Sequence, residues 1–308
     1  MKKRLTLLSL LLLFTMTAMA LTKVSVGGIY YYLDESDNTA EVTLKTDGTK
    51  YSGDIVIPAS ISVDGVDYSV TSIADHAFLN CSGLTSIEIP NSVTYIGYAA
   101  FYYCPGLTSI VVEEGNSYYD SRENCNAIIE TASNKLIAGC QNTVIPNSVT
   151  EIGDDAFSEC SSLTSIEIPN SVTSIGDCAF YGCYCLTSIV ISNSVKRIGY
   201  SAFAYCFGLT SITMQRATPP IVGSYLFDEC SKLETIYVPV GASEAYNKYP
   251  WNKYNIVERE VAGIESVTLE EWPADVYDLN GRMVKAQAES LDELPKGVYI
   301  VNGKKFVK

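Results

Sequence analysis

The sequence predicts a mainly β fold: a solenoid of about six to seven coils with short helical turns, an N-terminal β cap and a small C-terminal antiparallel β module. Three observations predict it. A phenylalanine recurs at a near-constant spacing, apolar and polar residues alternate within each unit, and glycine, proline and asparagine recur at fixed places between them.

The recurring phenylalanine sets the period of the repeat. Its positions are Phe78, Phe101, Phe157, Phe180, Phe203 and Phe227, with steps of 23, 56, 23, 23 and 24 residues. The long step equals one unit plus 33 residues, about 113–145, which we interpret as a degenerate longer coil. Such a period is typical of a solenoid, because a lone short unit cannot bury both of its faces and must stack on its neighbours.

The apolar positions within a unit predict the path of one coil. In the third clear coil they are Val149, Ile152, Ala156, Phe157, Cys160, Leu163, Ile166 and Ile168. Ile166 and Ile168 alternate with polar residues, which predicts a half-buried strand. The first two positions predict a second short extended segment, and residues 156–160 predict a helical turn.

Corner residues recur in phase as well. Glycine follows the second extended segment at Gly97, Gly153, Gly176, Gly199 and Gly223. Because Ala74 takes that place in the first coil, we expect close packing there and not a required positive φ. Prolines close the strand, at Pro58, Pro90, Pro146, Pro169 and Pro239. The asparagines that follow predict a column of side-chain hydrogen bonds between coils: Asn91, Asn147, Asn170 and Asn193.

The full pattern, L-T-S-I-x-I-P-N-S-V-T-x-I-G-x-x-A-F-x-x-C, resembles the leucine-rich repeats of BspA-like bacterial surface proteins. It matches residues 84–104, 163–183 and 186–206 almost position by position, and the resemblance covers roughly residues 54–258. This resemblance implies a curved leucine-rich-repeat β-solenoid, export to the cell surface or beyond, adhesion to host or bacterial macromolecules, and no enzyme activity.

The two ends of the repeat predict the domain organisation. Residues 1–20 form a signal peptide, 21–67 an N-terminal β cap, 68–260 the solenoid with its terminal cap, and 261–308 the C-terminal module. In the N-terminal cap we expect strands at residues 28–33, 41–45 and 53–57. The last unit carries an extra residue, and Ser243 is the predicted N-cap of a short helix after it.

The N-terminus has the features of a secretory signal. Lys2, Lys3 and Arg4 precede the apolar run 5–14, and Ala18 and Ala20 stand where a signal peptidase cuts. The run is too short for a membrane-spanning helix, and no cysteine follows Ala20 for lipid attachment. We therefore expect an exported protein without a transmembrane helix in its mature chain.

The C-terminal segment predicts β-hairpins. Asn280-Gly281 and Asn302-Gly303 are each flanked by alternating apolar residues. The runs 276–282, 294–301 and 304–308 resemble the C-terminal sorting domain of the type IX secretion system, although the segment is shorter than the fuller members. If the signal works, the resemblance implies passage across the outer membrane through the secretion machinery; otherwise the module stays on a periplasmic or surface protein.

The charge of the chain disfavours two classes of partner. Without Lys2, Lys3 and Arg4, the 21 basic residues become 18 against 35 acidic ones, a formal net charge near −17. Such a surface repels nucleic-acid phosphates and anionic lipid headgroups, and no basic stripe stands out in the sequence.

Six of the ten cysteines share one phase of the repeat: Cys81, Cys104, Cys160, Cys183, Cys206 and Cys230. Their stacked side chains would run parallel, which does not suit a disulfide, so we expect buried free thiols. The others, Cys125, Cys140, Cys178 and Cys185, are out of phase. Among these, Cys125 and Cys140 are the candidate disulfide pair.

No catalytic, metal or cofactor motif stands out. His76 is the only histidine and takes a variable position, with Ala99, Asp155, Cys178, Ser201 and Ser224 in its column, so we expect it to be exposed and non-catalytic. A glycosidase-like carboxylate pair, for instance among Asp154, Asp155 and Glu159, remains open beside the simpler interpretation of a solvated corner. We expect no cofactor.

The distinctive excess is tyrosine, with 22 residues. Aromatic residues at outward phases are the candidate ligand-binding residues, because tyrosine combines a rigid contact area with a polar tip. They are Tyr98, Tyr102, Tyr103, Tyr181, Tyr184, Tyr200, Tyr205 and Phe207. The alternative is that these rings only cover the edges of the stack.

The sequence thus favours an exported, non-enzymatic binding or adhesion protein whose polar and aromatic surface contacts a host or bacterial protein or glycan. Two alternatives stay open: a secreted carbohydrate-active enzyme, or an accessory to one, and a purely structural component of the cell surface.

Overall fold

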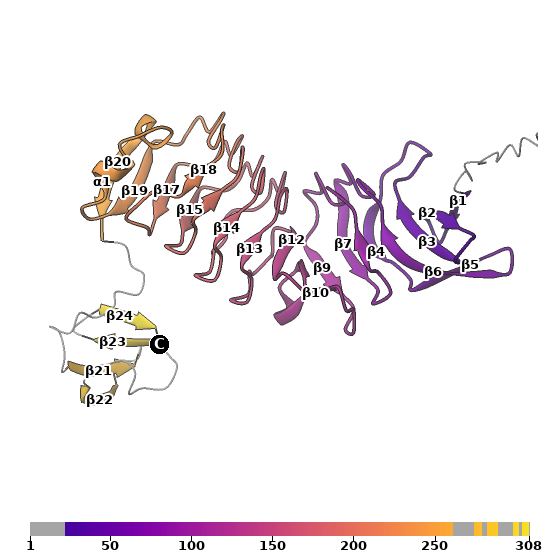
Figure 1. Ribbon diagram of the computed structural model, residues 1–308, viewed down its shortest axis with the longest axis horizontal. Coiled ribbons are helices and arrows are strands. Elements are labelled where there is room, and N and C mark those ends of the chain that lie inside the picture. The colour runs from indigo at the N-terminus through magenta and orange to yellow at the C-terminus, as the bar shows by residue number, and fades with distance from the viewer. Residues whose placement is uncertain (1–21, 261–273, 279–281, 289–297, 302–303, 308) are drawn as a thin grey trace, which may run out of the picture. The chain divides into compact units, whose positions relative to one another are not determined.

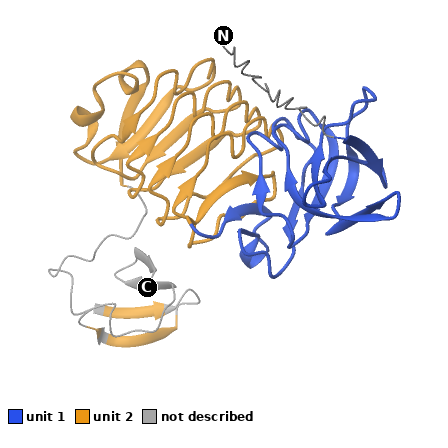
Figure 2. Ribbon diagram, turned by 45° about the vertical axis from the view of Figure 1, so that its right-hand side comes forward, with its two compact units in different colours: residues 1–132 blue, residues 133–308 orange. Residues whose placement is uncertain are grey.

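The computed structural model describes residues 22–260, 274–278, 282–288, 298–301 and 304–307 (Figure 1). The predicted signal peptide and both Asn-Gly pairs lie outside these residues. The chain divides into unit 1, residues 1–132, and unit 2, residues 133–308 (Figure 2). Among the described residues, none of the helices has the length and apolar character needed to cross a membrane.

Unit 1 begins with a sheet in the order β1-β2-β3-β6-β5, in which β6 also pairs with β8. The strands are β1 (Thr22–Val26), β2 (Ile29–Asp34), β3 (Thr39–Thr43), β5 (Ser60–Val63), β6 (Val66–Ile73) and β8 (Tyr95–Ile96). β1, β2 and β3 form an antiparallel meander, whereas β3, β6 and β8 run parallel. Of these, β1 and the β5–β6 hairpin were not predicted. The β1–β2 turn uses Gly27 and Gly28, both at positive φ.

A second, parallel sheet in unit 1 has the order β4-β7-β9: β4 (Ser52–Val56), β7 (Gly83–Ile89) and β9 (Ser109–Val112). Coil-like pairing therefore starts at β4, within the residues predicted as the cap. The predicted boundary at residues 67 and 68 falls inside β6 and stays a prediction. The degenerate unit contains β10 (Tyr119–Asp120), η1 (Arg122–Asn124) and β11 (Ala127–Glu130), and β10 pairs antiparallel with β11.

Unit 2 consists of stacked coils whose strands form two parallel sheets (Figure 1). One contains β12 (Lys135–Gly139), β13 (Glu151–Ile152), β14 (Ser174–Ile175), β16 (Arg197–Ile198) and β18 (Ile221–Val222). The other contains β15 (Ser188–Ile191), β17 (Ser211–Met214), β19 (Thr235–Pro239) and β20 (Asn255–Arg259). Equivalent residues of successive coils pair in register, for example Ile152 with Ile175 and Ile175 with Ile198. The prediction of a mainly β fold built from stacked coils is confirmed.

Two short helices follow β19: α1 (Ser243–Tyr246) and η2 (Trp251–Lys253). The prediction that Ser243 caps α1 is wrong: Ala242 is the N-cap, and Ser243 instead donates its N–H to Glu258 Oε1 at 2.9 Å. Further along the chain, β21 (Ala274–Asp278), β22 (Met283–Ala288), β23 (Val298–Val301) and β24 (Lys304–Val307) form an antiparallel sheet in the order β22-β21-β23-β24.

Phenylalanine rings form the centre of the coils. In unit 2, the rings of Phe157, Phe180 and Phe203 stack with centroids 5.1 and 5.2 Å apart and planes within 2°. All three side chains are fully buried. In unit 1, Phe78 stacks on Phe101 at 5.2 Å. The periodic phenylalanine is therefore the core residue that joins each coil to the next.

The in-phase cysteines are free, as predicted, and all but the half-buried Cys160 are buried. They are more than small apolar groups. The Sγ atoms of Cys183, Cys206 and Cys230 donate to the phenylalanine carbonyl of the preceding coil at 3.3, 3.1 and 2.9 Å. Burial raises the pKa of Cys104 to about 12. A thiol thus fits a place that needs a small, weakly donating side chain.

The Cys125–Cys140 disulfide prediction is wrong, because both cysteines are free. Each thiol contacts its own local chain: Cys125 Sγ lies 3.7 Å from Ala127 O, and Cys140 Sγ accepts from Thr143 Oγ1 at 3.8 Å.

The corner glycines behave as predicted. None of the five has a positive φ, and a Cβ on Gly176 or Gly199 would lie 2.4 or 2.3 Å from the Oδ1 atom of Asp154 or Asp177 in the preceding coil. Close approach between coils therefore excludes a side chain here.

Two predictions for the coil are corrected. In the third coil the predicted strand at Ile166–Ile168 is reduced to an isolated parallel bridge between Glu167 and Val190. The asparagine column does not link coils through its side chains in the described residues; it is exposed, and neighbouring hydroxyls take that role. Ser194 Oγ donates to Val172 O at 2.8 Å, and Thr210 Oγ1 donates to Thr187 O at 3.0 Å.

Candidate functional site

The segment around each phenylalanine is a series of turns and not the predicted helical turn. In unit 2 the residues two before and two after the phenylalanine have positive φ: 54° and 59° at Asp155 and Glu159, and 50° and 60° at Ser201 and Tyr205. These left-handed residues turn alternate N–H groups away from their own segment. We call the stack of these segments, residues 154–161, 177–184, 200–207 and 224–231, the turn wall.

The backbone bonds of the turn wall all run the same way. Asp155, Phe157 and Glu159 donate their N–H groups to carbonyls of the next coil, at Asp177, Ala179 and Tyr181. The next two coils repeat this pattern: Cys178, Phe180 and Gly182 donate to the following coil, as do Ser201, Phe203 and Tyr205. The segments are therefore held as a regular scaffold that fixes where their outward side chains lie.

Aspartates strengthen the scaffold at its corner. Asp154 Oδ1 accepts the N–H of Asp177 at 2.7 Å, and Asp177 Oδ1 accepts the N–H of Tyr200 at 2.7 Å. Unit 1 has the same bond between Tyr98 N–H and Asp75 Oδ1. Asp154, which we singled out as a candidate catalytic carboxylate, thus has a structural partner.

On this scaffold, four of the predicted ligand-binding residues meet. Tyr181 contacts Tyr205 with ring centroids 5.1 Å apart, Tyr205 contacts Phe207 at 5.9 Å, and Tyr184 stacks on Phe207 at 5.4 Å. Phe207 is exposed, and the three tyrosines are half-buried. We call these four residues the aromatic strip. It combines ring faces from two coils into one continuous surface.

The other predicted residues are not part of the strip. Tyr200 is exposed and contacts Tyr225 edge to face at 5.6 Å. In unit 1, Tyr98 and Tyr103 are exposed and Tyr102 is half-buried. Tyr98 contacts His76 at 5.8 Å. His76 is half-buried, so the prediction of an exposed histidine was only partly right.

Tyr225 was not among the predicted residues, because the extra residue of the last unit shifts its phase by one. Ser224 was predicted in the His76 column, whereas the positive φ of 57° shows that Tyr225 takes the place. The 24-residue step before Phe227 was the signal that could have found it. Tyr249 and Lys253 line a pocket together with Tyr225. They come after the last repeat in the sequence, so no periodic pattern could have predicted them.

Glu159 lies buried behind the strip. The residue is 6% exposed, and its Oε2 atom has no hydrogen-bond partner within the described part of the chain. Burial raises the pKa of this carboxyl group, and a hydrogen bond from Tyr184 of the strip opposes that rise. Above it is Gly182, where a Cβ would lie 2.6 Å from Glu159 Cδ. Glu159 therefore packs behind the rings of the strip, where a substrate bound to the surface would not reach its carboxyl group.

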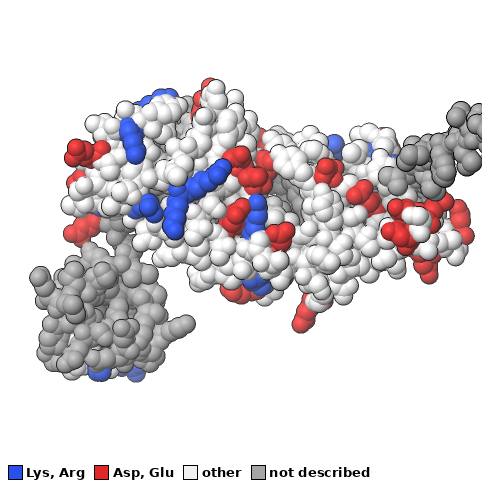
Figure 3. Space-filling view, viewed as in Figure 1, with Lys and Arg blue, Asp and Glu red and all other residues white. Residues whose placement is uncertain are grey.

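Charged side chains of both signs lie on unit 2. In the view of Figure 3, acidic side chains gather over the N-terminal strands of unit 1, and basic and acidic side chains both lie over unit 2. Within the described residues, no group of three or more His, Cys, Asp or Glu side chains is arranged to hold a metal ion. The site offers ring faces, phenolic hydroxyls and backbone groups.

Comparison with known proteins gives one match at the family level. The family described as "BspA type Leucine rich repeat region" matches residues 60–133 and 130–256, in six copies. A search of the curated proteins finds no match.

Three solved structures are similar to the chain. A leucine-rich repeat protein from Eubacterium ventriosum has 19% identity and a TM-score of 0.48, over 76% of this chain and 83% of that one. The leucine-rich repeat protein TpLRR from T. pallidum has 25% identity and a TM-score of 0.34, over 70% and 85%. A leucine-rich cell surface protein from Faecalibacterium prausnitzii has 21% identity and a TM-score of 0.34, over 80% and 96%.

Proposed function

Since the chain belongs to the BspA-type leucine-rich repeat family, we propose that it is an exported, non-enzymatic binding protein and that the aromatic strip contacts a protein or glycan ligand. The observation that carries this proposal is the continuous contact between Tyr181, Tyr205, Phe207 and Tyr184.

The strip has the physical properties of a binding surface. Its rings contact one another before any ligand arrives, so little side-chain entropy remains to be lost on binding. Tyrosine offers both an apolar face and a hydroxyl group, which suits the mixed surface of a protein or a sugar. The regular turn wall beneath holds the rings at fixed positions, which favours binding over passive edge cover.

The acidic side chains near the strip favour binding over hydrolysis. Asp154 accepts a backbone N–H, and Glu159 lies buried under Gly182. A glycosidase needs two carboxyl groups that both reach the scissile bond. This supports a binding protein over the carbohydrate-active enzyme that the sequence left open.

A binding array tests the proposal. The purified chain without residues 1–20 is applied to an array of glycans and host matrix proteins, and each hit is repeated with a Tyr181→Ala/Tyr205→Ala double variant. We expect at least about tenfold weaker binding, because two aromatic side chains at the centre of an interface contribute at least ~1.4 kcal/mol to the binding free energy.

The matched control is Tyr118→Ala, which removes a tyrosine that is 53% exposed and outside the strip. It should leave each hit unchanged. Equal binding by the double variant, or release of reducing sugar from a glycan hit, would contradict the proposal.

We also propose that the N-terminal signal and the C-terminal module direct the chain out of the cytoplasm, the latter as a type IX sorting signal. Cell fractionation of the full chain against a chain ending at Glu260 tests this. Full-length protein at the surface or in the medium, with the shortened chain in the periplasm, is expected. Periplasmic retention of both chains would contradict the sorting role.

A further inference from the structure

We propose that unit 2 binds a neutral sugar residue in a pocket at the C-terminal end of its turn wall. The pocket has a volume of about 400 Å³, within the size range of small-molecule sites. It lies between the last turn segment, residues 225–231, and the cap residues Tyr249, Pro250, Lys253 and Tyr254. It uses residues outside the aromatic strip, so this inference does not depend on the proposed function.

Three backbone N–H groups line the pocket without an acceptor among the residues that the structure describes. In the three preceding coils, the equivalent groups donate to the following coil. Tyr225, Phe227 and Glu229 hold the same positions in the last coil, with φ of 57° and 58° at Tyr225 and Glu229. No carbonyl or side chain in the described residues accepts their N–H groups. The pocket therefore presents a row of donors to any ligand that brings oxygen atoms.

The shape of this row disfavours an extended peptide as the occupant. A β-strand pairs with another segment in the extended conformation, whereas Tyr225 and Glu229 have left-handed backbones. In the earlier coils, the equivalent N–H groups are paired by the carbonyl groups of the next coil. After the last coil, the cap residues already occupy part of the space that a further coil would need. The remaining space beside the three N–H groups suits a small ligand that carries several hydroxyl groups.

The side chains around the row match a sugar. Tyr225 and Tyr249 are 55% and 64% exposed and offer ring faces for the C–H groups of a pyranose. The exposed carboxylates of Asp228 and Glu229 can accept hydroxyl protons, and the Lys253 ammonium, 4.9 Å from the Tyr249 ring centroid, can donate. An anionic ligand would face two carboxylates and a cationic one would face Lys253, so a neutral ligand fits best.

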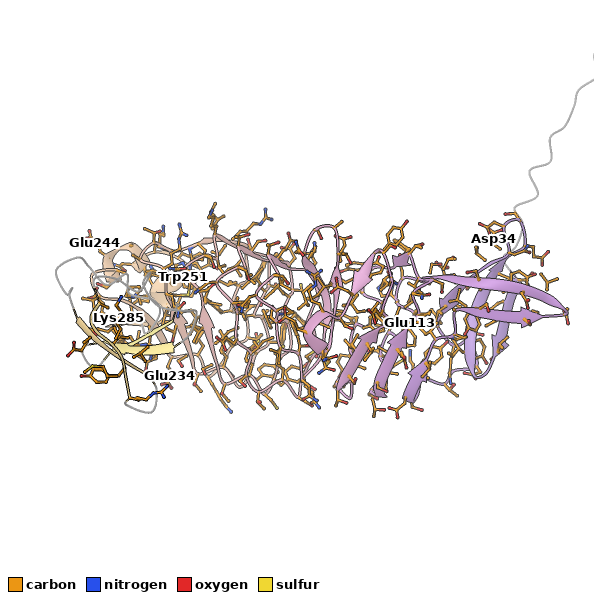
Figure 4. The ribbon with its side chains drawn as sticks, turned by 90° about the horizontal axis from the view of Figure 1, so that it is seen from below. Asp34, Glu113, Glu234, Glu244, Trp251 and Lys285 are labelled. Atoms are coloured by element: carbon orange, nitrogen blue, oxygen red, sulfur yellow. The ribbon has the colours of Figure 1, made fainter. Side chains whose placement is uncertain are left out.

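Two of the lining residues, Phe227 and Tyr254, belong to a packed aromatic cluster behind the pocket. The Phe227 ring contacts Trp251 and Tyr254 edge to face, each at 5.6 Å, and Trp251 contacts Tyr246 at 5.4 Å. Trp251, labelled in Figure 4, is 1% exposed and Tyr246 is fully buried. This aromatic cluster fixes the last turn segment, so the donors are in place before a ligand binds.

Amide NMR tests the inference directly. The full mature chain, labelled with ¹⁵N, is titrated with methyl β-glucopyranoside, methyl α-mannopyranoside and N-acetylglucosamine, and separately with glucuronate and an acetylated tetrapeptide. We expect at least one neutral sugar to shift the Tyr225, Phe227 and Glu229 amide signals, with a dissociation constant of roughly 1 mM for so small a ligand.

Two variants make the result specific. Tyr249→Ala should weaken the sugar at least about tenfold by removing a stacking ring, and its exposed position leaves the fold intact. Tyr205→Ala, in the aromatic strip, should leave sugar binding unchanged. The inference is overturned if no neutral sugar shifts these three amides, if only glucuronate or the peptide does, or if Tyr249→Ala binds like the wild type.

Discussion

Glu159 shows how a single residue can work against the stability of the coil that contains it. Its carboxyl group is buried, one of its oxygens has no partner, and burial raises its pKa. A raised pKa means that the folded protein binds the proton more tightly than the unfolded chain. The charged form therefore destabilises the fold once the pH rises through the folded-state pKa.

We predict that Glu159→Gln raises the free energy of unfolding by about 1 kcal/mol near neutral pH, because the neutral amide removes the cost of burying a charge. The gain should disappear below the ordinary glutamate pKa of about 4.3, where the wild-type carboxyl group is already protonated. Urea unfolding near pH 7 and near pH 4 measures both values.

Glu167→Gln, at an exposed position, is the matched control and should change stability by less than ~0.5 kcal/mol at either pH. A Glu159→Gln gain that persists at low pH would show that the charge is not its cause.

Residue-level predictions from the sequence succeeded where the period was strict. The phenylalanine and cysteine columns were predicted, because the interior of a stacked coil accepts few side chains at each phase. The hydrogen bonds from Cys183, Cys206 and Cys230 to phenylalanine carbonyls could not be predicted, since periodicity reports position and says nothing of a partner. Tyr225 was missed for a different reason: one inserted residue shifts the phase of the last unit.

At the scale of the element, the turn wall is held by backbone bonds and by the aspartate corner. Asp177 is bonded to the coil before it and to the coil after it. Its N–H group donates to Asp154 Oδ1, and its own Oδ1 atom accepts the N–H of Tyr200. Both bonds join one coil to the next, so a side-chain change here affects stacking without touching the core.

We predict that Asp177→Ala lowers the free energy of unfolding of unit 2 by about 1 kcal/mol, because the Tyr200 N–H loses its acceptor. Asp177→Asn keeps an Oδ1 acceptor in the same place and should retain most of the stability. Chemical denaturation of the three proteins measures the difference. Equal losses in both variants would assign the effect to charge and not to this bond.

The sequence predicted the strands of the coil better than its turns. Parallel, in-register strands follow directly from the repeat of Ile152, Ile175 and Ile198. The predicted helical turn failed because Ala156 and Phe157 suit a helix locally, whereas the flanking left-handed residues turn their N–H groups towards the next coil. The accepting carbonyl lies 22 or 23 residues further along the chain and leaves no local pattern.

For the molecule as a whole, stability in unit 2 comes from each coil lying on its neighbours. Phe180 is fully buried between Phe157 and Phe203. In such a stack, energy is shared between nearest neighbours and not across a single central core. Damage to one coil should therefore spread along the stack from that coil.

We predict that Phe180→Ala costs about 3–5 kcal/mol and speeds amide hydrogen exchange first in the turn segments on either side of it. Strands β1 to β3 of unit 1 should keep their protection. Phe207→Ala, which removes an exposed ring of the same type, should change exchange little. Uniform loss of protection throughout the described residues would contradict the nearest-neighbour behaviour.

The bonds between successive segments of the turn wall all point one way, so this wall of unit 2, taken by itself, has a net dipole. Peptide dipoles that point the same way add along the stack, as they do in a helix, and place partial positive charge at the last coil. Recombination that duplicates or deletes one whole 23-residue repeat would lengthen or shorten the strip and leave that terminal charge where it is. The length of the solenoid and the partial charge at its last coil can thus evolve separately in this protein.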